Sequence, residues 1–389
     1  MENLIIEKSI LSSDRKIIKT RFNLNDSDNE VYFKIINGDS TFVDSLESNI
    51  VLGLLPSIKS NIKCINVSDS LSEMFVRNLE TIQQIYNVWG LGEEVIKLNH
   101  TGLVKKESSG IRVGSFFSGG VDSFYTLLKN RDEITDIIFI HGLDIKLKDK
   151  ELRDKVSLRI KSIAKGLNLN LLEIETNVRD FLDPFVDWGE FGHGAALASI
   201  ALSISGDFKK IYIPATHSFK DLFPWGSHPV LDNLWSTEAL EFVHDGCEAT
   251  RVQKVTLISG NDIALQNLRV CYTNKNSEYN CGVCEKCLRT MVNLEVNNAL
   301  KRTPVFSNPL ILENIGNLNI ASDNSRSFVM ENIQAIDKIG GNEELKEALK
   351  ASLNISLVFL GKKKFKFLVK KVFGIEKILK FKSFFKKEI

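Results

Sequence analysis

The stretch from residue 111 to residue 129 constrains the possible folds of this chain more than any other. Residues 111–117 are mostly β-branched, aromatic or small and carry no charge after Arg112, which predicts a buried strand. The sequence SGGVDS at 118–123 then predicts a sharp turn, and residues 124–129 begin a helix. A strand, a glycine-rich turn and a helix start in this order predict a cradle for an anion.

The side chains of this turn suit phosphate. Gly119 and Gly120 let backbone N–H groups approach a phosphate closely, and the start of a helix adds a favourable dipole. Ser118 and Ser123 can donate to phosphate oxygens, while Asp122 can hold Mg²⁺ or orient a bound water. The sequence is neither GxxxxGK[ST] nor GxGxxG, so it is not typical of P-loop kinases or dinucleotide-binding proteins. A turn that merely joins a strand to a helix is the simpler alternative.

This motif resembles the pyrophosphate-binding loop of the PP-loop ATP pyrophosphatase superfamily, whose members are adenine nucleotide alpha hydrolase-like. The resemblance implies that ATP is split between its α and β phosphates and that AMP passes to a substrate oxygen. It also implies a doubly wound parallel α/β sheet, Mg²⁺ as a cofactor, and catalytic roles for Asp122 and Ser123. The ATP-binding residues that it implies in the loop are Phe117, Ser118, Gly119, Gly120, Val121, Asp122 and Ser123.

Strand and helix patterns alternate from residue 109 to about 245, which predicts a parallel sheet with helices on both faces. Ligands of such sheets bind beyond the C-terminal strand ends, so the segments 118–123, 141–144 and 215–221 should converge on one crevice. We therefore expect His141 and Asp144 to contact the adenosine of ATP. For His141, a capped or core histidine is the alternative.

The loop at 215–229 is rich in polar and aromatic side chains, which suits a polar, π-rich ligand better than a plain connector. We expect His217, Asp221, Trp225 and His228 to bind the substrate. The resemblance implies an acidic residue near the phosphates in this region, and Asp221 fits best. The alternative is an ordered surface loop with packed aromatic side chains.

Four cysteines form the second strong signal: Cys271, Cys281, Cys284 and Cys287, spaced C-x9-C-x2-C-x2-C. Four thiolates with short paired spacings predict a tetrahedral Zn²⁺ site, and a site with four sulfur ligands is structural because no position stays open. A [4Fe–4S] cluster is the rival, since thiolates alone do not exclude it.

The segments around these cysteines sharpen the resemblance. Val270-Cys271-Tyr272 and the sequence CGVCEKCLR at 281–289 are similar to the zinc knot of the 7-cyano-7-deazaguanine synthase family, and the similarity covers residues 110–295. Two departures matter. The substrate segment of that family is replaced here by residues 221–228. Arg289 follows the last cysteine one residue sooner than the arginine of the family's zinc knot does. The resemblance therefore implies ATP chemistry and zinc, but not recognition of a deazaguanine.

The pattern divides the chain into an N-terminal α+β module at 1–108, a PP-loop domain at 109–300 that includes the zinc knot at 271–289, and a helical extension at 301–389. In the first module, residues 17–22 and 30–36 predict a hairpin, and Ser70 with Glu73 predicts a capping box for a helix at 71–86. We find no catalytic constellation in this module. It can serve as a fold support, a dimer surface or a substrate lid.

The charges are unevenly distributed. Residues 361–389 contain eleven Lys and two Glu, so the rest of the chain carries a formal net charge of −8, which argues against a nucleic-acid-binding surface. The basic, amphipathic tail can lie on an anionic membrane, dock on the acidic body or bind RNA. We find no signal peptide or membrane span, and the cysteines are clustered, so we expect a cytoplasmic protein, and a homo-oligomer.

Together these features predict an ATP-dependent carbon–nitrogen ligase. It would adenylate a carboxylate or carbonyl oxygen of a small molecule and release pyrophosphate, after which ammonia would displace AMP to give an amide or nitrile. Two alternatives stay open: a tRNA-modifying sulfurtransferase of the same superfamily, and a nucleotide-binding module without catalysis.

Overall fold

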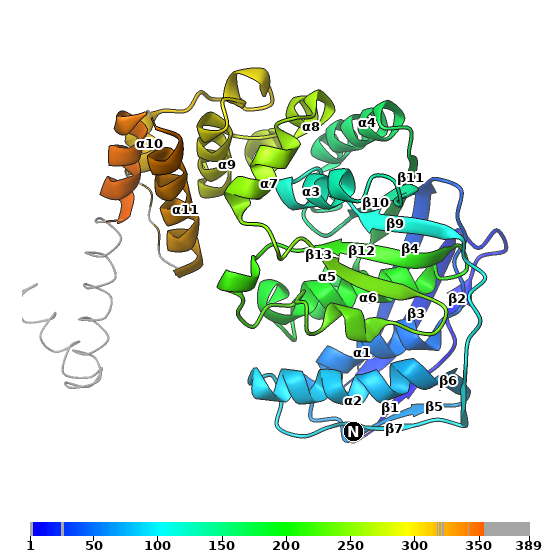
Figure 1. The fold of residues 1–389 in the computed structure, drawn as a ribbon. Helices are drawn as coiled ribbons and strands as arrows, with labels where there is room; N and C mark the ends of the chain where they lie inside the picture. Colours follow the sequence, from blue (N-terminus) through cyan, green and yellow to red (C-terminus); the bar gives the residue numbers. More distant parts are fainter. Residues whose placement is uncertain are drawn as a thin grey trace, which may run out of the picture.

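Eight strands form the central sheet, in the spatial order β13 (Glu241–Asp245), β12 (Phe208–Pro214), β9 (Arg112–Phe116), β10 (Asp136–His141), β11 (Asn170–Thr176), β4 (Ser27–Asn37), β3 (Ile17–Leu24) and β2 (Ile10–Leu11) (Figure 1). This computed structural model describes residues 3–24, 27–316, 318, 320, 323–340 and 342–353. The five strands from β13 to β11 pair in parallel, as the alternating pattern after residue 109 predicts.

The N-terminal hairpin is part of the same sheet. β3 and β4 pair antiparallel, as predicted, and β4 also pairs antiparallel with β11, so that Ile35 lies opposite Ile174. The predicted boundary at residue 108 therefore does not separate two sheets. Alternating side chains identify half-buried strands, but they do not show which sheet edge those strands join.

Helices cover both faces of this sheet (Figure 1). Ile137 and Phe139 of β10 pack with one group of helices, whereas Ile138 and Ile140 pack with the other, which explains why the whole strand is apolar. The first group is α3 (Val121–Lys129), α4 (Lys150–Gly166), α7 (Arg251–Ile258) and α8 (Asp262–Asn267), and the second is α1 (Leu46–Lys59), α2 (Glu73–Val88), α5 (Val178–Leu182) and α6 (His193–Ser203).

The expected cap of the helix at 71–86 is wrong. The N-cap of α2 is Ser72, whose hydroxyl accepts from the N–H of Phe75 at 3.0 Å, and Ser70 lies in a short strand instead. Several serines precede this helix, and the sequence does not show which of them caps it. The remaining strands are β1 (Asn3–Ile6), β5 (Cys64–Val67) and β7 (Lys97–Asn99), which form a parallel sheet, and β6 (Ser70–Ser72), which pairs with β8 (Gly102–Val104).

The C-terminal part of the described chain is helical, as expected, and packs on α9 (Glu285–Val296) through a separate apolar cluster. This part comprises α10 (Leu312–Gly316), α11 (Asp323–Ile339) and a helical segment at 343–353. The basic tail at 361–389 lies outside the described residues. Within the described ranges, no helix has the length and apolar character needed to cross a membrane.

Candidate functional site

The predicted strand, turn and helix are present around residues 118–123. β9 ends at Phe116 and α3 begins at Val121, and Gly119 turns the chain with φ +78°, in the left-handed region that favours glycine. The N-cap of α3 is Gly120, and no side chain of the described residues caps this helix. The first turn of α3 therefore offers its backbone N–H groups to a ligand.

A cavity of about 330 Å³ lies beside this turn. It is unusually rich in positive charge, because among the described residues five cationic side chains and two carboxylates line it. The cations come from segments far apart in the sequence. The lining residues are Ser118, Gly120, Val121, Asp122, Ser123, Asp144, Arg179, Trp188, Arg251, Arg269, Val270, Cys271, Tyr272, Lys286, Arg289 and Thr290.

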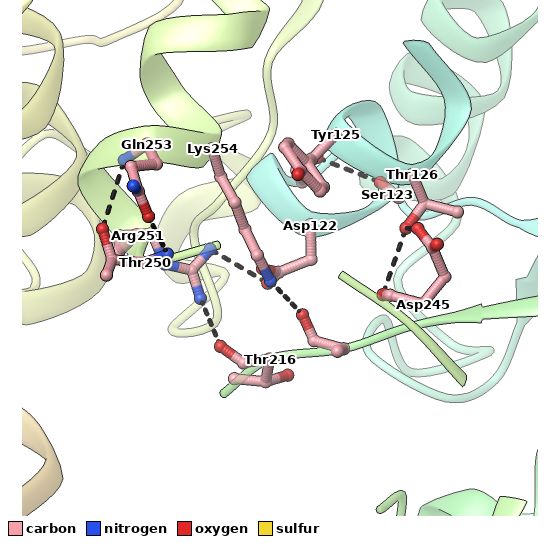
Figure 2. Close-up of polar contacts among 12 residues, drawn as sticks. Asp122, Ser123, Tyr125, Thr126, Thr216, Asp245, Thr250, Arg251, Gln253 and Lys254 are labelled. Atoms are coloured by element: carbon pink, nitrogen blue, oxygen red, sulfur yellow. Dashed lines mark hydrogen bonds and ion pairs between the residues drawn. The ribbon is translucent and has the colours of Figure 1, made fainter. Parts of the chain in front are cut away.

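Asp122 is clamped by two cations of α7 (Figure 2). Arg251 donates Nη1–H to Oδ2 at 2.9 Å, and Lys254 donates Nζ–H to Oδ1 at 3.0 Å. Burial alone would raise the pKa of Asp122, but the two cations outweigh burial and lower this pKa to about 2. Arg251 and Lys254 are 6% and 1% exposed, so the pairs are shielded from solvent.

The same two cations hold the end of β12 (Figure 2). Lys254 donates to the carbonyl oxygen of Ala215 at 2.5 Å, and Arg251 donates to that of Thr216 at 3.3 Å. Both carboxylate oxygens of Asp122 thus already accept from cations. This arrangement makes Asp122 an anchor for the basic residues of α7, and its expected role as a Mg²⁺ ligand stays a prediction.

Several cations of the cavity keep unused donors. The Nε atoms of Arg251 and Arg269 are buried and have no hydrogen-bond partner among the described residues. The ammonium group of Lys286, which also lines the cavity, makes no hydrogen bond to the described residues either. Desolvation lowers the pKa of Arg289, and the charge of Arg251 lowers it further. A multiply charged anion would use these donors and relieve this crowding of positive charge.

The four predicted cysteines form one group, with all Sγ atoms within 4.8 Å of one another. The Sγ of Cys271 lies 3.6 Å from that of Cys281 and 3.9 Å from that of Cys284, and Cys281 lies 3.9 Å from Cys287. A tetrahedron of sulfurs at the Zn–S distance of ~2.3 Å has edges of about 3.8 Å, so the group could hold a metal ion such as zinc.

The cysteine group borders the cavity. Cys271 belongs to the group and also lines the cavity. The cavity residues Arg269, Lys286 and Arg289 lie within two positions of one of these cysteines in the chain. Part of the positively charged wall is therefore built by the segments that carry the thiols.

Of the two residues expected to contact adenosine, only Asp144 lies at the cavity. Asp144 also lines an adjoining cavity of about 840 Å³, which Arg179 and Tyr272 share with the first. His141 is buried, with its ring nitrogens at 3.2 Å from Oε1 of Glu173 and at 3.3 Å from Nε of Arg153. It is not among the described residues that line either cavity.

Two of the four residues expected to bind substrate, His217 and Trp225, lie in contact with each other. His217 and Trp225 form an aromatic cluster with Phe223 and with Phe328 of α11, in which the ring centroids of His217 and Phe223 are 4.7 Å apart. Burial and nearby Arg251 lower the pKa of His217 to about 4.

Asp221 and His228 point elsewhere. Asp221 accepts from Ser218 and from Ser327 of α11, both at 2.7 Å, and thus ties the loop to the C-terminal helix. His228 is buried, and the centroid of its ring lies 5.2 Å from that of Trp89. None of the four lines the cavity beside α3 within the part of the chain described.

Sequence reasoning missed most of the basic residues of this site. Arg251 and Lys254 are three positions apart on one helix face, a spacing that also occurs on ordinary solvated helices. The chain has 50 Lys and Arg, so residue type alone does not single out the few that line a cavity.

Comparisons of this chain with protein-family models, with curated proteins and with solved structures found no match.

Proposed function

We propose that the turn at 118–123 and the cationic cavity bind the polyphosphate of ATP, and that the protein is an ATP-dependent carbon–nitrogen ligase. It adenylates a carboxylate oxygen of a small molecule and releases pyrophosphate, and ammonia then displaces AMP to give an amide. Where the product is a nitrile, a second ATP adenylates the carbonyl oxygen of that amide, again releasing pyrophosphate, and loss of AMP and of the two N–H protons forms the C≡N bond. One observation carries the proposal: the uncapped N-terminus of α3 faces a cavity lined by five cationic side chains.

The chemistry of adenylation suits such a cavity. When the bond between the α and β phosphates breaks, negative charge accumulates on the departing pyrophosphate, and fixed amides and cations stabilise it. The amides of the α3 start and the side chains of Arg269, Lys286 and Arg289 supply these groups. The protein acts by positioning the reactants and neutralising charge, so a nucleophile with its own general base is not needed.

The cysteine group acts as a structural zinc site in this proposal. Four thiolates complete the coordination of the ion and leave no position open for a substrate. Sulfur spacings of 3.6–3.9 Å suit a single ion between the thiolates, whereas a cluster of four irons needs them further apart. Zinc would hold the chain segments that carry Arg269, Lys286 and Arg289 at the cavity.

The thiols favour a ligase over a sulfurtransferase. Sulfur transfer needs a reactive cysteine beside the nucleotide, and Cys271 is the one cysteine among the described residues that line the cavity. Cys271 belongs to the group that fits a metal, so its thiolate is not free to carry sulfur.

The test is release of AMP and pyrophosphate from ATP by the purified protein, with ammonium and a panel of carboxylic acids. Lys286→Met should weaken ATP binding about tenfold or more, because a charged donor in the cavity is lost, whereas Lys301→Met, an exposed lysine elsewhere, should change nothing. ATP binding without turnover of any acid would favour the module without catalysis. Failure to bind ATP would refute the proposal.

A further inference from the structure

We infer that α11 supports the polyphosphate site from behind its arginines and that Phe328 is a positioning residue for Arg251 and Arg289. The inference rests on the proposed function, because it assigns to the C-terminal extension a role in the same cavity. α11 lies beyond residue 295, where the resemblance in sequence ends.

One aromatic ring contacts two arginines from different helices. The Cζ atom of Arg289 lies 4.1 Å from the ring centroid of Phe328, and that of Arg251 lies 5.4 Å from it. Both distances are within the ~6 Å range of cation–π attraction. Phe328 is 6% exposed, so water does not weaken either contact, and both arginines line the cavity.

The ring of Phe328 contacts two side chains of like charge. Arg251 and Arg289 repel each other, and Arg289 has a competing partner on its own helix, because its Nε lies 3.4 Å from Oε1 of Glu285. A carboxylate between the arginines would hold them but would also cancel the charge that an anion needs. The face of Phe328 attracts both guanidinium groups and leaves their charge in place.

α11 is fixed firmly enough to position the ring. Glu331, one turn after Phe328, accepts from the backbone N–H of Arg251 at 3.1 Å. Ser327, the residue before Phe328, donates to Asp221 at 2.7 Å. On another side of the helix, Val329 belongs to the apolar cluster that includes Val292 of α9. The helix is thus tied to the loop after β12 and to both helices that carry the arginines, α7 with Arg251 and α9 with Arg289.

The experiment measures the affinity of the full chain for inorganic tripolyphosphate by titration calorimetry, with the thermal stability of each variant. Phe328→Leu removes the ring and should weaken binding about tenfold, whereas Phe328→Tyr keeps the ring and should stay within about twofold of the wild type. The matched control is Val329→Ala, on the same helix but in the apolar cluster, which should lower stability without weakening binding.

The outcomes separate this inference from the proposed function. Equal affinity of Phe328→Leu and the wild type, or equal weakening by Val329→Ala, would refute the positioning role while the cavity still binds polyphosphate. If the wild type binds neither tripolyphosphate nor ATP, the proposed function fails and this inference with it. Should Phe328→Leu not fold, Phe328→Met gives the same comparison, because a flexible apolar chain adapts to a core more easily.

Discussion

Arg251 and Asp122 are 129 positions apart in the sequence, yet they form an ion pair of 2.9 Å at the start of two helices. Lys254, one turn further along α7, holds the other oxygen of the same carboxylate. Asp122 therefore stays ionised at neutral pH and fixes the orientation of two buried cations beside the cavity. This relationship makes the carboxylate of the glycine-rich turn a structural anchor.

Asp122→Asn should lower the free energy of unfolding by about 3 kcal/mol, because it leaves the buried Lys254 ammonium without a counter-charge. Urea unfolding at neutral pH measures this change. The matched control is Asp144→Asn, which removes the same charge from an exposed residue of the same cavity and should change stability by less than about 0.5 kcal/mol. Similar, small effects of both variants would contradict the anchoring role.

The local features of the site could be predicted from the sequence. The apolar residues before Ser118 and the two glycines after it determine a strand and a turn through contacts a few residues apart, and the structure has both. The cysteine spacing likewise predicts a metal-binding group, because the last three thiols are separated by two residues each and Cys271 lies at the opposite end of a short loop.

The long-range features could not be predicted. Nothing near Arg251 or Phe328 in the chain indicates that they meet Asp122 or Arg289, since those contacts depend on how helices pack. Asp221 is a similar case. A carboxylate in a loop after a strand is a reasonable phosphate neighbour, but its partner Ser327 lies 106 residues away and became visible only with the fold.

Gly119→Ala should weaken the binding of tripolyphosphate and lower the free energy of unfolding by about 1 kcal/mol. A Cβ at this position would have room, with Arg269 Cβ at 3.5 Å, so the cost comes from the positive φ. The strain would shift the amides that face the cavity. Gly90→Ala is the control, because its φ of +82° imposes the same cost at a site with nothing within 4 Å. Equal affinities of the two variants would contradict a role of the turn in binding.

Cys284→Ser should lower metal content and thermal stability together, since a structural metal site contributes its binding free energy to folding. Cys64→Ser is the control, because Cys64 is a cysteine outside the group and should leave both quantities unchanged. Elemental analysis with thermal unfolding measures the pair. Full stability of Cys284→Ser without bound metal would refute the metal site.

Removal of the metal with a chelator should also weaken tripolyphosphate binding in the wild type. Arg269, Lys286 and Arg289 lie beside the cysteines in the chain, so loosening the thiols should displace donors of the cavity. Titration calorimetry before and after chelation, and after zinc is restored, checks this. Unchanged affinity in metal-free, folded protein would show that the cysteine group and the cavity are independent.

His217 and His244, whose side chains are both shielded from solvent, should give the stability opposite pH dependences. Burial and Arg251 lower the pKa of His217 to about 4. As the pH falls, the imidazole of His217 is therefore protonated in the unfolded chain before it is protonated in the folded protein. The contribution of His217 is complete above its ordinary pKa of about 6.5 and is lost as the pH falls towards 4. For His244, burial alone would lower the pKa, but the hydrogen bond to Asp232 at 2.7 Å raises it to about 9.

His217→Gln should therefore remove about 2 kcal/mol of the loss of stability between pH 8 and pH 5, because the variant has no imidazole to protonate. His244→Gln is the matched control, since the contribution of His244 is complete below pH 6.5 and is lost only as the pH rises towards 9. Its acid slope should equal that of the wild type, and its alkaline slope should be shallower. Urea unfolding at pH values from 5 to about 9 measures both slopes. An unchanged acid slope in His217→Gln would mean that His217 is protonated in the folded protein as readily as in the unfolded chain, and that Arg251 does not act on it.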